Sequence, residues 1–585
     1  MKKEKINWIV KLSRILIFIT SALGLGAIII EYGFKFSRED AVILHYISLG
    51  VVIVFILYQI LHFFISESKK EYIKSHKIEL IILAFIFAEL ILSFFDYSFV
   101  EKIGNVLHFK DIAYLYILFA QIIIIIGLIL GGLRYNKNIL QSKIHPSRLF
   151  ILSFLATITI GALLLLLPAA TVNGGISVVD AVFTSTSAVC VTGLITQDTA
   201  TYFTSFGQIV ILLLFQIGGL GLMTFTTFFA IFLSGGLGIK ESIILHDLLD
   251  EENIGAITKV ISFLTVTTFV IELLGAAILF FSIHQNYDDV GAAIFISIFH
   301  SVSAFCNAGF SLFTLNLMDN LVISNYLFTT TISILIILGG IGFPTIMSLW
   351  SKRIWTKLPA SQKRFSIQTR IIVITTLALI VSGTVVFYLL ELRYSLSGLD
   401  EAQKIHASYF QSVTSRTAGF NTIDFAKTGL TTSLFVLFLM FVGASPGGTG
   451  GGIKTTTFAI MILGTMSILR NQKHVTIGNR TIPREIILKA FIKTFFSIGI
   501  ISAGILFLTI SENKNLIDIM FESFSAFGTV GLSRGITGSL TDSGKLVITF
   551  LMFIGRVGPL AFIYSIMKPK EQPNYDFPSE NISIL

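Results

Sequence analysis

Charged residues and cysteines are scarce in this sequence of 585 residues. Only 13% of the residues are Asp, Glu, Lys or Arg, whereas soluble domains carry about 25%. Hydrophobic residues make up 54% of the chain, and they gather in many stretches near the ~20 residues that cross a bilayer core. The composition therefore excludes a soluble globular protein and predicts an all-α polytopic membrane protein. The two cysteines provide no disulfide framework.

Motifs of enzyme active sites are also missing. The sequence contains no H-E-x-x-H, no paired cysteine motif and no nucleophile elbow, so it predicts no enzyme. The stretch GGTGGGIKT departs from a Walker A motif because Ile453 separates Gly452 from Lys454 and no strand precedes it. No extended soluble region could form a nucleotide-binding domain, and we expect no bound cofactor.

Twelve apolar spans are predicted, and basic residues fill the short loops on one side of them. The formal charge of +8 therefore reflects positive-inside topology rather than a nucleic-acid surface. The even number of spans places both termini on the cytoplasmic side of the cytoplasmic (inner) membrane. The first apolar stretch continues to about Ile30 without a small-residue cleavage pattern, which indicates a retained helix. The predicted spans are 10–31, 41–65, 78–96, 112–133, 149–168, 204–233, 258–283, 324–350, 371–392, 433–466, 490–510 and 545–567.

Four short segments between spans resemble one another. They share a Phe, a Ser two residues later, and a Gly near their end, with the third segment one residue shorter. The four glycines follow one another at intervals of 116, 110 and 112 residues. The segments are FTSTSAVCVTGL (183–194), FHSVSAFCNAGF (299–310), FQSVTSRTAGF (410–420) and FESFSAFGTVGL (521–532).

A second glycine cluster follows each segment inside the next span. Lone glycine pairs could be helix-packing motifs, but four paired matches at similar spacing predict four units of span, re-entrant piece and span. Two spans per unit give all units one orientation, so they surround an axis along the membrane normal rather than forming inverted repeats. The predicted division is an N-terminal four-helix extension (1–147), four membrane–pore–membrane units (148–240, 241–352, 353–470 and 471–568) and a cytoplasmic tail (569–585).

A central pore lined by main-chain carbonyls follows from this arrangement. Such a ring replaces the hydration shell of a monovalent cation, and glycine permits the close approach and the positive φ that it needs. The predicted selectivity filter is Val191, Thr192, Gly193, Leu194, Asn307, Ala308, Gly309, Phe310, Thr417, Ala418, Gly419, Phe420, Thr529, Val530, Gly531 and Leu532. Within it, K⁺ is expected at Thr192, Gly193, Asn307, Gly309, Thr417, Gly419, Thr529 and Gly531.

At these residues the sequence resembles the Trk/Ktr/HKT superfamily of potassium transporters, from about Arg148 to Lys568. In that family each unit contributes one filter glycine, and a Ser at the first of them favours sodium. Gly193 therefore implies potassium, transported as the substrate. The family also has a flexible loop that interrupts a span of unit three and a basic residue in the last span. The residues of such a gate here are Gly443, Gly447, Gly448, Gly450, Gly451, Gly452, Lys454 and Arg556.

The resemblance further implies partners. Bacterial relatives are homodimers in the lipid membrane that dock on a cytosolic ring of nucleotide-binding regulatory subunits of the TrkA/KtrA kind, so nucleotide would bind that partner and not this chain. These relatives have at most two helices before the first unit, whereas four are predicted here.

Two functions stay open. One is potassium uptake through a gated, channel-like pore, in which Arg556 repels a cation below the filter. The other is a secondary transporter that couples K⁺ to H⁺ or Na⁺, since Glu272, Glu391 and Glu522 lie in or near the membrane. These acids could instead pair with an arginine such as Arg416, and Arg556 could be a structural ion pair or a cap on carbonyl groups.

Overall fold

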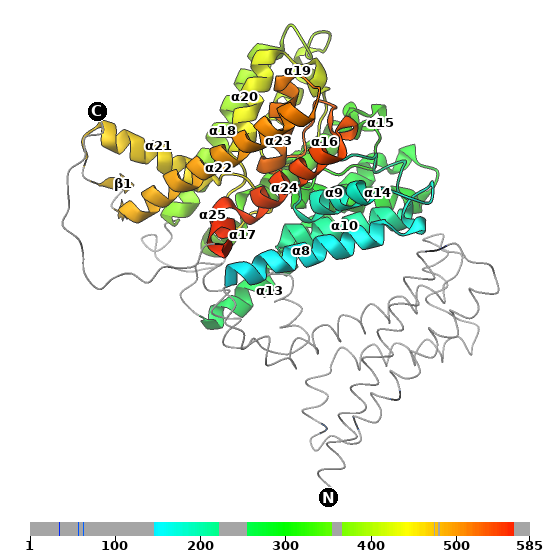
Figure 1. Ribbon diagram of the computed structural model, residues 1–585, viewed down its shortest axis with the longest axis horizontal. Helices are drawn as coiled ribbons and strands as arrows, with labels where there is room; N and C mark the ends of the chain where they lie inside the picture. Colours follow the sequence, from blue (N-terminus) through cyan, green and yellow to red (C-terminus); the bar gives the residue numbers. More distant parts are fainter. Residues whose placement is uncertain are drawn as a thin grey trace, which may run out of the picture.

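The structure is a computed structural model that describes residues 146–221, 254–353, 365–472, 474–477 and 480–566, together with Phe34, Leu57, Phe63 and Lys69. The four spans predicted before residue 146 and the tail 569–585 lie outside the described ranges. The described part is almost wholly helical (Figure 1).

Helices follow one another along the chain in four groups. Each group has a first helix, then a second helix that is shorter than the first and that we call the short helix, then a third helix. Group one is α8 (Pro146–Leu165), α9 (Val178–Val189) and α10 (Ser205–Leu220), and group two is α13 (Ile254–Ile283), α14 (Val290–Cys306), α16 (Tyr326–Ile341) and α17 (Phe343–Arg353). Group three is α18 (Ile367–Glu391), α19 (Glu401–Thr414), α20 (Leu430–Phe441) and α21 (Thr455–Leu469), and group four is α22 (Arg484–Ser511), α23 (Leu516–Gly528), α24 (Asp542–Val557) and α25 (Pro559–Ile566).

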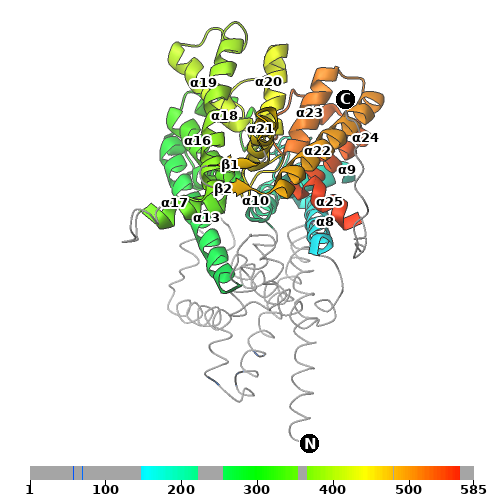
Figure 2. The same ribbon diagram turned by 90° about the vertical axis from the view of Figure 1, so that its left-hand side faces the viewer.

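Shorter elements join these helices. They are η1 (Pro168–Ala170), η2 (His284–Asn286), η3 (Asn316–Met318), α15 (Asn320–Ile323), η5 (Phe425–Lys427) and η6 (Thr537–Ser539). Between groups three and four, β1 (Val475–Ile477) pairs antiparallel with β2 (Arg480–Ile482), with Thr476 opposite Thr481. This small hairpin lies against α21 (Figure 2).

The groups close into a cycle through one recurring contact. The third helix of each group packs against the short helix of the next: α10 on α14, α16 on α19, α20 on α23, and α24 back on α9. Figure 2 shows α16, α18 and α19 on one side and α22 to α25 on the other. The short helices α9, α14, α19 and α23 are therefore held between neighbouring groups.

Three described helices are long and apolar enough to cross a membrane: Phe263–Asn286, Ile367–Glu391 and Arg484–Ser511. The span predicted over 324–350 is not one straight helix, because α16 and α17 meet at an angle of 100°. Gly342 ends α16 with a φ of +91° and Pro344 follows it at the start of α17. A left-handed glycine ends a helix without a Cβ penalty, and proline is tolerated in the first turn of the next.

The span predicted over 545–567 is broken in the same way. Gly558, with a φ of +89°, separates α24 from α25, whose first residue is Pro559. In group one Gly221 has a φ of +77° and ends α10, so the predicted span 204–233 is helical only to Leu220 within the described residues. In groups two, three and four, where the chain is described beyond the third helix, a break follows that helix, so breaks are not confined to the glycine loop of group three.

Serines of the short helices bind the first helix of their own group. In three groups the Ser that follows the motif Phe by two residues donates its hydroxyl to a main-chain carbonyl on that helix. The bonds are Ser185 to Ile158 (2.7 Å), Ser301 to Glu272 (2.6 Å) and Ser412 to Ile380 (2.8 Å). In group four Ser523 instead donates to Ile519 of its own helix (2.8 Å). In groups one to three the shared Ser therefore anchors the short helix to the first helix.

Candidate functional site

Each short helix ends in a chain segment that turns twice through the left-handed region. We call residues 191–194, 307–310, 417–420 and 529–532 the glycine segments. In each of them the glycine and the residue two before it have positive φ, from 50° to 91°. The residue two before the glycine is Val191, Asn307, Thr417 or Thr529. A β-branched valine with φ of 57° is uncommon, so the surrounding structure holds this backbone in place.

The four glycines form a ring. A Cβ built on Gly193 would lie 3.0 Å from the Cα of Gly309, and one on Gly309 would lie 3.0 Å from the Cα of Gly419. A Cβ on Gly419 would lie 3.1 Å from the Cα of Gly531, and one on Gly531 would lie 3.1 Å from the Cα of Gly193. The cycle closes, so glycines separated by more than a hundred residues in sequence meet at one centre.

Main-chain carbonyls accompany this ring. A Cβ on Gly193 would approach the carbonyl oxygen of Ala308 to 2.5 Å, one on Gly309 that of Ala418 to 2.7 Å, and one on Gly419 that of Val530 to 2.6 Å. A Cβ on Gly531 would collide with the carbonyl oxygen of Thr192. Each glycine thus lies beside the carbonyl that precedes the glycine of the next segment, and no side chain other than hydrogen fits there.

The apolar side chains that follow the four glycines pack into the core. All sixteen residues of the glycine segments are buried. Leu194 and Phe310 belong to one apolar cluster, Phe420 to a second and Leu532 to a third. These four side chains therefore pack away from the ring, and the glycines leave main-chain groups beside one another.

A hydroxyl on each short helix holds its glycine segment. In groups one and four the N–H groups of Gly193 and Gly531 donate to Ser187 and Ser525, both at 3.1 Å. In groups two and three the hydroxyls donate instead to the carbonyl after the glycine: Ser303 to Phe310 (2.8 Å) and Thr414 to Phe420 (2.6 Å).

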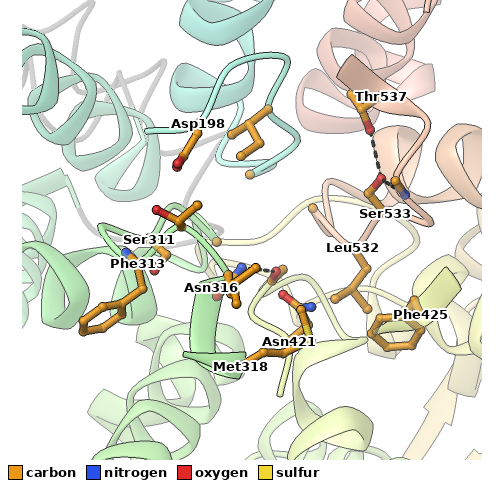
Figure 3. A pocket seen from close by; sticks show the side chains of 18 of the residues that line it. Asp198, Ser311, Phe313, Asn316, Met318, Asn421, Phe425, Leu532, Ser533 and Thr537 are labelled. Carbon is orange, nitrogen blue, oxygen red and sulfur yellow. Dashed lines mark hydrogen bonds between the residues drawn. The ribbon is translucent and has the colours of Figure 1, made fainter. Parts of the chain in front are cut away.

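A cavity of about 330 Å³ opens at one end of the ring (Figure 3). We call it the outer cavity. All four glycines line it, and it is completed by residues that follow them in the chain, among them Asp198, Asn316, Asn421 and Asp424. Carboxylate and amide groups at its wall suit a hydrated cation better than an apolar ligand. Among the described residues no group of three His, Cys, Asp or Glu side chains could hold a metal ion.

The glycine loop, residues 443–454, lies at the other end of the ring. The N–H of Gly451 donates to the Thr529 hydroxyl (2.8 Å), and the loop's Thr449 donates its N–H to the Gly339 carbonyl (3.1 Å). The loop contacts Thr529, which precedes Gly531, whereas the cavity is lined by the glycines and by residues that follow them. The loop and the cavity therefore lie at opposite ends of the ring. The loop is closed at its base by a bond from the Gly443 N–H to the Ile453 carbonyl (2.9 Å). Lys454 turns back onto the loop and donates to the Gly450 carbonyl (2.6 Å).

Arg556 of α24 binds this loop directly. Its guanidinium donates to the carbonyl of Thr449 and to the carbonyl of Gly218 on α10. These are the contacts of a cap on carbonyl groups, which was one of the two interpretations of Arg556 from the sequence. Because one of the capped carbonyls belongs to the loop, the guanidinium also joins the loop to groups one and four.

The intramembrane acids bind neutral groups rather than Arg416. Glu272 accepts from the Gln216 amide (3.1 Å), Glu391 from Ser395 and Gly429, and Glu522 from Ser533, the Arg534 N–H and Thr537. Arg416 is buried, and its Nε has no hydrogen-bond partner among the described residues. The suggested pairing of these acids with Arg416 is therefore absent from this part of the chain.

Two contacts of the site escaped prediction from the sequence. Asn316, which has a φ of 56°, donates its side-chain amide to the carbonyl of Gly419 (3.4 Å). Lys545 of α24 forms a buried ion pair with Asp180 of α9 at 2.7 Å, with both side chains only about a tenth exposed. Neither Asn316 nor Lys545 lies in a repeated motif, so nothing in the sequence pattern singled out these two residues.

The apolar helices and the central ring define a multi-pass helical membrane transporter. The chain belongs to the TrkH family of cation transport proteins, which it matches over residues 119–576. It is 40% identical to the Ktr system potassium uptake protein B of Bacillus subtilis over 452 residues, which are 77% of this chain and 99% of that protein.

Other known proteins are similar over comparable lengths. The potassium/sodium uptake protein NtpJ of Enterococcus hirae is 32% identical, with 77% of this chain and 99% of that protein covered. The crystal structure of the potassium transporter TrkH from Vibrio parahaemolyticus matches with a TM-score of 0.62 at 17% identity, over 83% of this chain and 97% of that one. This last likeness shows the same fold.

Proposed function

We propose that the protein takes up potassium across the cytoplasmic membrane through a gated, channel-like pore with a four-glycine selectivity filter. The observation that carries this proposal is the closed ring, in which each filter glycine lies beside the carbonyl before the next glycine. A ring of main-chain carbonyls can replace the water around a monovalent cation. Relatives whose names state potassium uptake, at 40% and 35% identity, support the choice of ion.

The four helix groups are, in this proposal, four membrane–pore–membrane units in pseudo-fourfold arrangement, with the boundaries predicted from the sequence. The recurring contact of each third helix with the next short helix supports it. So do the paired left-handed residues that occur once per group. Four extra transmembrane helices would precede these units.

The gate is the glycine loop together with Arg556. The loop lies against the glycine segments on the side away from the outer cavity, and six of its twelve residues are glycine, so few side chains have to repack when it moves. A partly buried guanidinium beside it places a fixed positive charge on the proposed ion path, which disfavours a cation there. Release of the Arg556 contact with Thr449 would free the loop.

Partners complete the proposal. We expect a homodimer that is regulated by a cytosolic ring of nucleotide-binding subunits, as the family resemblance implies, and one relative is named as protein B of a Ktr system. Both termini of this chain would then be cytoplasmic, and the nucleotide would bind the ring.

A secondary transporter that couples K⁺ to H⁺ or Na⁺ is the alternative. Glu272 favours it, because this carboxyl group is buried and contacts Gln216 and Cys306, and Cys306 directly precedes a glycine segment. One relative is named for both potassium and sodium.

Flux into liposomes of purified protein separates the two. A channel-like pore moves K⁺ and Rb⁺ down their own gradients when no proton or sodium gradient is present, whereas a coupled transporter requires the second gradient. Gly193→Ser should raise Na⁺ flux relative to K⁺, because the new side chain meets the carbonyl of Ala308. Gly174→Ser is the matched control, since Gly174 has a similar φ of +77° but open space around it. An unchanged K⁺/Na⁺ ratio in Gly193→Ser would refute the filter.

A further inference from the structure

A second polar position recurs in the four motifs, directly after the shared Phe. The residue eleven positions later lies two or three positions beyond the filter glycine of the same motif. The four pairs that this spacing defines are Thr184 with Ile195, His300 with Ser311, Gln411 with Thr422, and Glu522 with Ser533.

Three of these pairs are hydrogen-bonded. The Gln411 amide donates to the Thr422 hydroxyl (2.8 Å), and the Ser533 hydroxyl donates to Glu522 (2.5 Å). His300 lies 3.0 Å from the Ser311 hydroxyl through Nε2. Its Nδ1–H donates to the Ile296 carbonyl (2.8 Å), so in the neutral ring Nε2 accepts the hydrogen bond from Ser311. We call these three bonds the outer ties.

The two residues of each outer tie are always eleven positions apart, whereas the spacing from the motif Phe to the filter glycine varies between motifs. The third motif is one residue shorter than the others between its Phe and its glycine, yet Gln411 still meets a partner eleven residues on. The partner is then three residues beyond Gly419 instead of two. His300, Gln411 and Glu522 are completely buried, where an unpaired polar group is costly. The same contact has therefore been rebuilt with three different pairs of side chains.

Group one has no outer tie. Ile195 offers no hydrogen-bonding side chain, is 38% exposed, and lines the outer cavity. Its counterpart Thr184 is buried, and its hydroxyl has no partner among the described residues. The segment after Gly193 is thus the only one of the four described segments that lacks this hydrogen bond to its short helix.

We propose that the outer ties are positioning contacts that fix the outer ends of three filter segments and so set the ion selectivity, while the first segment remains free to adjust. This proposal rests on the four-glycine filter proposed above. A functional site selects only when its groups are held to within about half an ångström by supporting contacts. K⁺ and Na⁺ differ in size, so a filter segment that relaxes inward admits the smaller ion more readily.

Two isosteric substitutions test the proposal on purified full-length protein in liposomes. Thr422→Val removes the tie of group three. Among the described residues, the Thr422 hydroxyl bonds only to Gln411. We expect the K⁺/Na⁺ flux ratio to fall about fivefold, which corresponds to the loss of one net hydrogen bond. Thr184→Val makes the same chemical change in group one, where the hydroxyl has no partner, and it should leave the ratio unchanged. Equal losses in the two variants, or none in Thr422→Val, would overturn the proposal.

A double-mutant cycle shows whether the contact itself matters. Gln411→Met removes the donor of the same tie and should lower the ratio as Thr422→Val does, while the double variant should be no worse than either single one. Additive losses would mean that the two side chains act separately and would count against the tie. Gly193→Ser, measured in parallel, keeps the two proposals apart: if it shifts the ratio and Thr422→Val does not, the ties fail and the filter stands, and if neither shifts it, the filter fails as well.

Discussion

The side-chain amide of Asn316 in group two donates to the main-chain carbonyl of Gly419 in group three, at 3.4 Å. The N–H of Leu317 donates to the other end of the same amide at 2.9 Å, and this fixes which end faces Gly419. Figure 3 shows Asn316 at the wall of the outer cavity with its bond to this carbonyl. One of the four glycines of the ring is therefore capped by a neighbouring group on the side of the cavity.

Replacing this cap with an acceptor changes the outermost ion position. In Asn316→Asp the carboxylate cannot donate to Gly419, so the freed carbonyl and the new charge both face an entering cation. We expect K⁺ uptake to show a several-fold lower KM with an altered K⁺/Na⁺ ratio, measured as flux against external concentration.

Asn421 is the matched control for this change. It lines the same cavity, but its amide donates to the Ile423 carbonyl of its own segment (3.0 Å). Asn421→Asp adds the same charge without touching a filter glycine, so it should lower the KM and leave the ratio alone. Identical behaviour of the two variants would mean that Asn316 acts through charge only.

Loss of the Arg556 contacts should open the gate. Arg556→Gln removes the positive charge and the bonds to the Thr449 and Gly218 carbonyls, so we expect higher K⁺ flux without any regulatory subunit. Arg556→Lys keeps the charge but loses the planar fork that spans two carbonyls, and its flux should lie between those of the native protein and Arg556→Gln.

Arg470→Gln serves as the control for charge alone, because Arg470 is exposed at the end of α21. Shortening the loop within Gly447–Gly452 should reproduce the effect of Arg556→Gln. Native flux in both the shortened loop and Arg556→Gln would show that this loop is not the gate.

The ion pair between Asp180 and Lys545 should stabilise the closure of the ring. It links the first group to the last, which the chain does not connect directly. Lys545→Met leaves a buried carboxylate without its partner, and removing one member of a buried pair costs about 3–5 kcal/mol. Thermal unfolding in detergent should show a clear decrease in stability.

The exposed pair of Lys404 and Glu401 provides the comparison. Their charged atoms are 2.8 Å apart, close to the distance in the buried pair, but Glu401 is 68% exposed, and water screens such surface pairs so that they stabilise little. Lys404→Met should therefore change the unfolding temperature little. Similar shifts for the two lysine variants would contradict a special role of the Asp180 pair.

Filter glycines should tolerate no side chain. In Gly309→Ala the new Cβ would lie 2.7 Å from the Ala418 carbonyl oxygen in addition to the strain of a left-handed alanine, and we expect K⁺ flux to be lost. Gly174→Ala carries the same strain, about 1–2 kcal/mol, in open space, and should retain flux. Normal flux in Gly309→Ala would place this glycine outside the ion path.

Much of the site could be predicted from local pattern. The four glycines recognised from their repeated surroundings are those whose backbones meet in the ring, and in three groups the motif serine anchors the short helix. Such features repeat because these groups make similar contacts within themselves, so they leave a regular mark on the sequence. The break of α16 at Gly342 was not predicted, although Gly342 and Pro344 are residue types at which helices end or bend.

The sequence by itself indicated a membrane protein and predicted four related units with one glycine each, because burial in lipid and a glycine-only backbone both restrict composition locally. Only the tertiary structure decided which unit neighbours which, that Asn316 reaches Gly419, and that Arg556 holds Thr449. Those contacts join residues about a hundred positions apart through single side chains, and their partners follow from the packing of whole helices rather than from any periodicity along the chain.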